Sequence, residues 1–150
     1  MAVFRLLRVP RRYCQFGILL ALGIWLAANF LPCTQVIEAG RYARPSVEAM
    51  HGFRLLVLGW LGLFALSFAW YANIPYFYCL WKLFRGQASW RVSLFAFCLA
   101  LSALLPHAIY SEVDGWHRAY IAGPALWVWL CAFAINLALA GLSFVGPGAK

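Results

Sequence analysis

The sequence predicts an all-α membrane protein in which four transmembrane helices form one antiparallel bundle, a single domain over residues 1–150. Of the 150 residues, 65% are hydrophobic and 11% are charged, whereas soluble domains carry about 25% charged residues. The chain also contains eight Trp and seven Tyr residues, which are enriched at membrane–water interfaces. A lipid bilayer is therefore the expected surrounding of most of the chain.

Four apolar runs are the expected spans, and each must be helical because an open extended segment leaves backbone groups unsatisfied in lipid. They cover about residues 13–32, 55–75, 92–109 and 121–145. The second run continues to about residue 84, and such a helix would be about 45 Å long against a core of about 30 Å. Because proline removes an N–H donor and clashes with the preceding turn, we expect Pro75 to break this helix near its cytoplasmic end.

The Lys and Arg residues predict the orientation of the spans. The N-terminal segment, the 82–91 connection and the C-terminus carry most of them: Arg5, Arg8, Arg11, Arg12, Lys82, Arg85, Arg91 and Lys150. The opposite side carries four: Arg41, Arg44, Arg54 and Arg118. Because cytoplasmic segments carry the excess of Lys and Arg, we expect a bacterial inner-membrane protein with both termini in the cytoplasm.

Amides within the spans are the main candidates for functional polar contacts. Asn29, Asn73 and Asn136 are expected either to hydrogen-bond between helices or to contact a partner helix. We expect Asn73 to bond a backbone carbonyl freed by Pro75, or to meet Asn136 at a similar depth. Small residues at helical spacing predict close helix packing, with a homodimer surface as the alternative: Gly17, Ala21, Ala96, Ala100, Ala134 and Ala138.

Two connections, about residues 33–54 and 107–120, are expected to be solvated periplasmic loops of mixed charge. The second loop holds aromatic residues beside charged ones, a combination suited to contacts with a protein partner or to anchoring at the headgroups. These candidate contacts are Tyr110, Glu112, Asp114, Trp116 and His117. Their spacing matches no standard zinc pattern, so no metal site is expected.

Several function classes are disfavoured by the sequence. No charged residue or His lies well inside a span, which argues against ion-coupled transport and against a haem held by paired histidines. No catalytic motif is evident, and the five cysteines form no CxxC pair, as a membrane thiol oxidase would need. We therefore expect no enzyme activity, no catalytic residues, no cofactor and no nucleic-acid partner.

Three segments resemble motifs of a group of uncharacterised bacterial inner-membrane proteins with four spans. They are "GWLG" at Gly59–Gly62, "WYANIP" at Trp70–Pro75 and "GPALWVW" at Gly123–Trp129. The group has "WYANP" in the second motif, so Ile74 is an insertion here. The resemblance implies four spans and a bacterial envelope, and it implies no reaction. In architecture alone, the expected bundle is similar to immunity proteins against pore-forming colicins.

The expected function is non-catalytic binding within the bilayer, most concretely as an immunity protein that neutralises a membrane-inserting toxin. Recognition would join helices through small-residue stripes and asparagines, helped by the two periplasmic connections. The alternatives are an accessory subunit of a bacterial envelope complex and a small transporter or channel. The expected partners are thus the lipid bilayer and a membrane protein, and a homo-oligomer is a further alternative.

Overall fold

The computed structural model describes residues 11–37, 46–58, 68–87, 89–111 and 115–144. This part of the chain is mostly helical and also contains a four-stranded sheet. The α-helices are α1 (Arg11–Phe30), α2 (Gly52–Leu58), α3 (Asn73–Phe84), α4 (Trp90–Leu101) and α5 (Pro124–Phe144). Two short 3-10 helices are η3 (Ala69–Ala72) and η4 (Ser102–Leu104). The strands are β1 (Pro32–Ile37), β2 (Ser46–His51), β3 (His107–Ser111) and β4 (Gly115–Ala122).

Two of the described helices are long and apolar enough to cross a membrane. They cover Tyr13–Phe30 in α1 and Pro124–Ser143 in α5, within the expected first and fourth spans. A third apolar helical stretch, Trp90–Leu104, is shorter. The expected span at 92–109 is too long at its C-terminal end, because β3 begins at His107. The structure therefore supports membrane association, and the four-span bundle stays a prediction.

The expected second span, 55–75, has different boundaries in the structure. α2 ends at Leu58, the residues 59–67 lie outside the described part, and helical structure resumes with η3 and α3. Pro75 does not end a helix, because it lies in the first turn of α3, which runs on to Phe84. Proline is tolerated there since an N–H in the first turn has no acceptor within the helix. The local irregularity is the change from 3-10 to α-helix at Asn73.

The sheet was missed by the sequence analysis, which expected solvated loops over 33–54 and 107–120. Its strand order is β2-β1-β4-β3, and all neighbouring strands are antiparallel. β1 pairs with β2 from Pro32↔His51 to Ile37↔Ser46. It also pairs with β4, where Thr34 lies opposite Ala122. Much of the connections 33–54 and 107–120 is therefore strand. Pairing between distant segments satisfies backbone N–H and C=O groups that were expected to hydrogen-bond with water.

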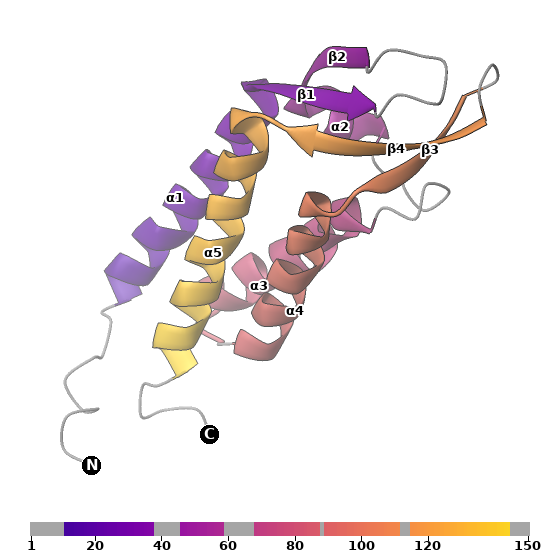
Figure 1. Cartoon of the computed structure of the whole chain (residues 1–150). Coiled ribbons are helices and arrows are strands. Elements are labelled where there is room, and N and C mark those ends of the chain that lie inside the picture. The colour runs from indigo at the N-terminus through magenta and orange to yellow at the C-terminus, as the bar shows by residue number, and fades with distance from the viewer. Residues whose placement is uncertain (1–10, 38–45, 59–67, 88, 112–114, 145–150) are drawn as a thin grey trace.

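The helices and the sheet are arranged end to end (Figure 1). α1 and α5 lie side by side and antiparallel, and α3 and α4 form a second pair behind them. The sheet lies where α1 ends and α5 begins, whereas the start of α1, the end of α5 and the connection from α3 to α4 lie toward the opposite end. This arrangement is compatible with both termini on one side of a membrane.

Two glycines join the sheet closely to the helices. The Gly52 N–H donates to the Leu31 carbonyl at 3.2 Å, and a Cβ at Gly52 would collide with the backbone carbonyl oxygen of Ala28. Gly123 has φ +115°, a region that L side chains rarely adopt, and an added Cβ would lie 3.2 Å from the Cys33 Cα. Glycine permits both the close approach and the positive φ.

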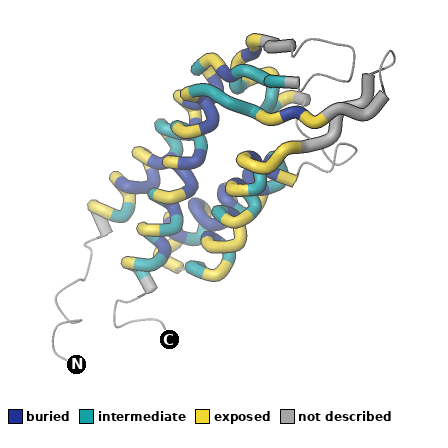
Figure 2. Tube along the Cα trace, viewed as in Figure 1, coloured by how far each residue is buried: buried dark blue, intermediate teal, exposed yellow. Residues whose placement is uncertain are grey.

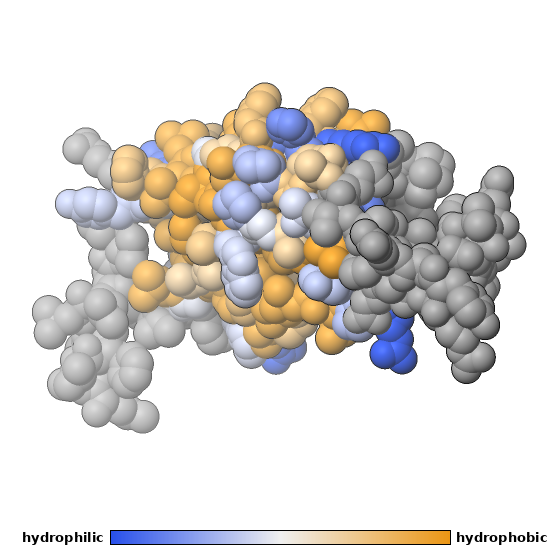
Figure 3. Space-filling model, turned by 45° about the horizontal axis from the view of Figure 1, so that its top comes forward, coloured by the Kyte–Doolittle hydropathy of each residue, from blue (hydrophilic) through white to orange (hydrophobic). Residues whose placement is uncertain are grey.

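Many alanines are buried in the interior of the helical layers, beside larger buried residues such as Tyr76 and Phe133, and many large apolar residues are exposed. Figure 2 marks the buried and exposed positions along the chain. The following alanines are fully buried, with 0% exposure: Ala21, Ala72, Ala96, Ala100, Ala132 and Ala140. Exposed large residues include Tyr13, Phe16, Phe30, Ile74, Phe95 and Trp127. Figure 3 shows apolar residues over much of one face. Soluble monomers rarely expose apolar surface this widely, and small interior residues are typical of helices packed in lipid.

Candidate functional site

The buried side chain of Asn73 joins three helical segments at the start of α3. Its Oδ1 accepts hydrogen bonds from Nε1 of Trp25 in α1 at 2.9 Å and from Nε1 of Trp129 in α5 at 3.2 Å. Its Nδ2 donates to the Trp70 carbonyl in η3 at 2.9 Å. We call Asn73, Trp25 and Trp129 the asparagine junction. One amide thereby fixes α1 and α5 relative to the beginning of α3.

The junction satisfies polar groups that would otherwise be costly to bury. An indole N–H usually finds an acceptor when its ring is buried, and an unpaired polar group in a low-dielectric interior loses the full benefit of hydration. Asn73 bonds the carbonyl of Trp70, whereas the carbonyl that Pro75 was expected to free is that of Tyr71, four residues before it. Among the described residues, the hydrogen bonds of its side chain do not include Asn136 either. Trp70 extends the network, because its Nε1 donates to the Leu56 carbonyl in α2 at 2.7 Å.

Asn136 lies one layer away, against the carbonyl of Tyr76. Its Nδ2 donates to that carbonyl at 3.5 Å, while its buried Oδ1 has no hydrogen-bond partner in the described part of the chain. Tyr76 is itself fully buried, and its hydroxyl donates to the Ala21 carbonyl at 2.9 Å. The Tyr76 ring packs on Phe133 of α5 with centroids 4.5 Å apart. Asn136 therefore makes a weak interhelical contact beside a well-packed aromatic pair.

Asn29 makes a local contact and not the expected interhelical one. Its Nδ2 donates to the Trp25 carbonyl, four residues earlier in α1, at 2.8 Å. The sequence analysis missed the residues that complete the junction, Trp25 and Trp129. Their signal was present, because each indole inside an apolar run needs an acceptor and Asn73 is one of few side chains able to supply it.

The expected periplasmic contacts lie on or beside the β3–β4 hairpin. Tyr110 is paired with Trp116, and Ile109 with His117, so three of the five candidates are strand residues and not loop residues. Glu112 and Asp114 lie outside the described residues. Among the residues that the structure describes, no group of three or more His, Cys, Asp or Glu side chains is placed to hold a metal ion.

Two of the three small-residue pairs are buried in the structure, and the third is exposed. Gly17 and Ala21 are buried in α1, and a Cβ at Gly17 would come within 2.6 Å of the Leu139 Cδ2, so α1 packs closely on α5. Ala96 and Ala100 are also fully buried. Ala134 and Ala138 are exposed, so the expectation that they pack between helices of this chain is wrong.

The exposed residues of α5 form a continuous face. They recur at spacings of three and four, which places them on one side of the helix: Trp127, Cys131, Ala134, Ala138 and Leu142. We call these five residues the outward face of α5. The helix turns Ala132, Asn136 and Ala140 inward, so its outward face is a second, separate stripe with small side chains at its centre.

Comparison of the chain with protein-family models, with curated proteins and with solved structures finds no match. The resemblance of "GWLG", "WYANIP" and "GPALWVW" to an inner-membrane protein group therefore stays an expectation, as does the likeness to immunity proteins. The functional argument depends on the asparagine junction and on the outward face of α5.

Proposed function

We propose that this chain is a non-catalytic binding protein of the bacterial inner membrane, an immunity protein that neutralises a membrane-inserting toxin by packing against one of its helices. The observation that carries the proposal is the outward face of α5. This helix is long and apolar enough to span a membrane, yet Cys131, Ala134 and Ala138 lie at the centre of its exposed side.

The contrast with α1 supports a protein partner over lipid at this face. The exposed side of α1 carries more large residues than that of α5, and these suit contact with lipid chains, although it also includes the small Gly23 and Ala27. The large exposed residues of α1 are Tyr13, Phe16, Leu19, Leu20, Leu26 and Phe30. Small residues instead let a second helix approach closely, and close packing drives helix association where lipid removes the hydrophobic force. Trp127, 60% exposed, and Leu142 bound the small stripe and offer larger contacts to the same incoming helix.

The asparagine junction makes α5 a rigid platform for such a partner. Trp129 is hydrogen-bonded to Asn73, and Phe133 packs on Tyr76, both on the side of α5 that faces the core. A surface on a helix that is already fixed by contacts on its opposite side loses less conformational entropy when it binds. The proposed division is therefore an inward face that fixes the helix and an outward face that recognises the toxin.

A protection assay tests the proposal. The chain is expressed together with candidate membrane-inserting toxins, and a voltage-sensitive dye reports the membrane potential of the cells. We expect the wild-type chain to keep the membrane polarised and the Ala134→Leu/Ala138→Leu variant to fail, because leucine side chains hold a partner helix away. Ala27→Leu is the matched control, since Ala27 is exposed on α1 and outside the proposed surface.

Two outcomes would contradict the immunity function. One is full protection by the double variant at equal expression and equal melting temperature. The other is depolarisation of cells that carry the wild-type chain to the same extent as cells that lack it.

The sheet favours an accessory subunit of an envelope complex as the second candidate. β2 and β3 are the outer strands of the described sheet, and an outer strand can accept a strand from a partner. Photo-crosslinking groups at Ala49, exposed in β2, and at Ala138 separate the two functions. A stoichiometric crosslink from position 49 alone would favour the accessory role, and one from position 138 alone would favour toxin capture.

A further inference from the structure

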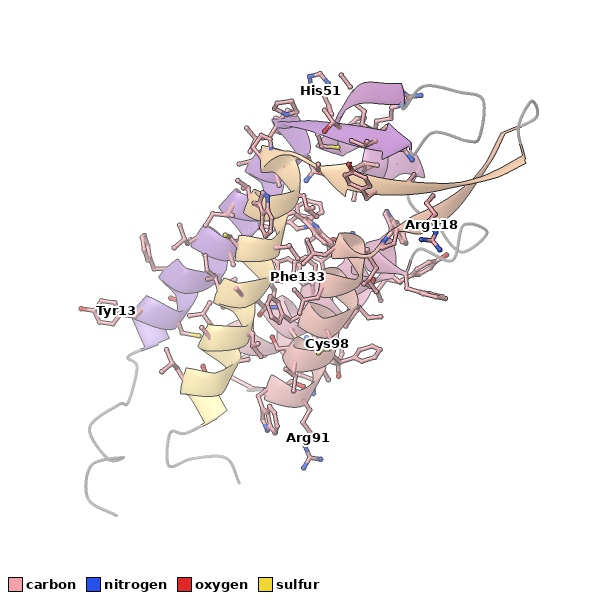
Figure 4. All side chains as sticks on the ribbon, in the orientation of Figure 1. Tyr13, His51, Arg91, Cys98, Arg118 and Phe133 are labelled. Atoms are coloured by element: carbon pink, nitrogen blue, oxygen red, sulfur yellow. The ribbon has the colours of Figure 1, made fainter. Side chains whose placement is uncertain are left out.

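The turn between α3 and α4 holds three cationic residues at the end of the molecule away from the sheet. α3 ends at Phe84, Gly86 has φ +75°, and the Gln87 N–H donates to the Lys82 carbonyl at 2.9 Å. Lys82 lies in the last turn of α3 and Arg85 directly follows it, and α4, which begins at Trp90, carries the exposed Arg91 (Figure 4). We call Lys82, Arg85 and Arg91 the cationic turn.

Aromatic rings hold two of these cations in position. The Cζ atom of Arg85 lies 4.2 Å from the centroid of the Trp81 ring, and the Lys82 Nζ lies 5.5 Å from that of Tyr78. Both rings are about half exposed, at 47% and 45%. Because Trp and Tyr side chains settle at the level of the headgroups and long cationic side chains extend toward the interface, the cations are placed at the depth of lipid phosphates.

The sequence supplies no carboxylate side chain to neutralise this turn. The whole chain contains four acidic residues, and all are in or next to the strands in sequence: Glu38, Glu48, Glu112 and Asp114. The opposed helix dipoles do not supply the missing charge either. The negative end of α3 and the positive end of α4, about half a charge each, meet in the turn and largely offset each other. The three side chains therefore set the sign of the local field.

We propose that the cationic turn binds the headgroup of an anionic phospholipid, with Arg85 and Arg91 contacting the phosphate and Trp81 positioning Arg85. Arginine presents several N–H donors in a planar arrangement that fits phosphate oxygens. Each basic residue near an anionic membrane surface strengthens binding about fivefold. The site is separate from the outward face of α5 and does not depend on toxin capture.

Titration of the purified full chain with short-chain lipids in a neutral detergent tests this site. The melting temperature is followed against phosphatidylglycerol, phosphatidylcholine or inorganic phosphate, and native mass spectrometry counts bound lipid. We expect phosphatidylglycerol alone to raise the melting temperature in a saturable way. The Arg85→Gln/Arg91→Gln variant should weaken the apparent affinity roughly 25-fold, as the product of two fivefold effects.

Arg118→Gln is the matched control, because Arg118 is exposed on β4 at the sheet end (Figure 4). It removes one positive charge, as each of the two substitutions in the cationic turn does, and should leave phosphatidylglycerol binding unchanged. Trp81→Leu keeps every charge and should weaken binding by a smaller factor than the double variant. Equal stabilisation by phosphatidylcholine or by inorganic phosphate would overturn the proposal, as would an equal loss of affinity in Arg118→Gln. Retained binding in Arg85→Gln/Arg91→Gln would do the same.

Discussion

The single side chain of Asn73 hydrogen-bonds to three helical segments, α1, η3 and α5. An amide oxygen has two lone pairs and the amide nitrogen has two hydrogens, and Asn73 uses both lone pairs and one hydrogen. Trp25 and Trp129 each contribute a donor with a large apolar ring, so the same residues supply packing and hydrogen bonds. Asn136, which lies outside the asparagine junction, leaves its oxygen unpaired in the described structure.

Asn73→Leu is expected to lower the free energy of unfolding by about 2 kcal/mol, because it leaves the indole N–H groups of the buried Trp25 and the part-buried Trp129 without an acceptor. Asn29→Leu is the control and should cost about 1 kcal/mol or less, since the Trp25 carbonyl that Asn29 contacts can also accept a bond within α1. Thermal unfolding in detergent measures both. A smaller effect of Asn73→Leu than of Asn29→Leu would contradict the role of the junction.

The burial of Cys33 in β1 leads to a second prediction at the scale of a residue. Burial raises the pKa of the Cys33 thiol above its ordinary value, so folding favours the protonated form. Stability should be complete below the ordinary thiol pKa and should fall as the pH rises through the raised pKa of the folded state. In a variant that retains only Cys33, maleimide labelling should stay slow at pH 8 and become fast in denaturing detergent. Fast labelling of the folded chain would show that the thiol is accessible.

At the scale of elements, the sequence reveals the long apolar helices better than it reveals the sheet. The stretches Tyr13–Phe30 of α1 and Pro124–Ser143 of α5 lie within the runs expected at 13–32 and 121–145. Nearly all their residues are apolar, and lipid leaves the backbone little alternative to a helix. The pairing of β1 with β4 joins Thr34 to Ala122, and no pattern within a short window contains that information. Pro75 was assigned to a helix end because proline fits a first turn and a break equally well.

The asparagine junction was not predicted for the same reason, because its residues are far apart in the sequence. Asn73 was recognised as a polar residue in an apolar run, but its partners Trp25 and Trp129 lie on helices at the two ends of the chain. Which helix faces which depends on packing of small residues such as Gly17 and Ala96. Helical spacing identifies such residues without showing which way they point, as the exposed Ala134 demonstrates.

The junction between β4 and α5 depends on Gly123. Gly123→Ala should lower the free energy of unfolding by about 1–3 kcal/mol, because φ +115° is strained for alanine and its Cβ would press on the Cys33 Cα. Gly23→Ala is the matched control: Gly23 lies within α1, and an added Cβ there meets no atom within 4 Å. It should raise stability by about 0.5–1 kcal/mol through helix propensity. Chemical denaturation in mixed micelles compares the two, and equal effects would argue against a special backbone at Gly123.

At the scale of the whole molecule, large apolar side chains are exposed more widely than in a soluble protein. Alanines such as Ala21 and Ala100 occupy the interior, while Phe16 and Trp127 face outward. The cationic turn and the sheet lie at opposite ends of this apolar body. Together these features favour an orientation in which the helical layers are in lipid and the sheet is outside it.

Reporter fusions test this orientation. Green fluorescent protein at the C-terminus should fluoresce, since both termini are expected in the cytoplasm. Alkaline phosphatase inserted between β3 and β4, after residue 113, should be active, since the sheet is expected in the periplasm. Green fluorescent protein inserted after residue 113 should not fluoresce, and alkaline phosphatase at the C-terminus should be inactive. Activity of alkaline phosphatase at the C-terminus would reverse the orientation.

The contact of the first helix with the last has a consequence for biogenesis. α1 packs on α5, and β1 pairs with β4, so α1 and β1 leave the ribosome before these two neighbours have been synthesised. Until then the indole of Trp25 has no α5 beside it, and β1 has only β2 available. We therefore expect nascent chains stalled before residue 124 to be degraded quickly, and a separately expressed segment containing α5 to rescue them.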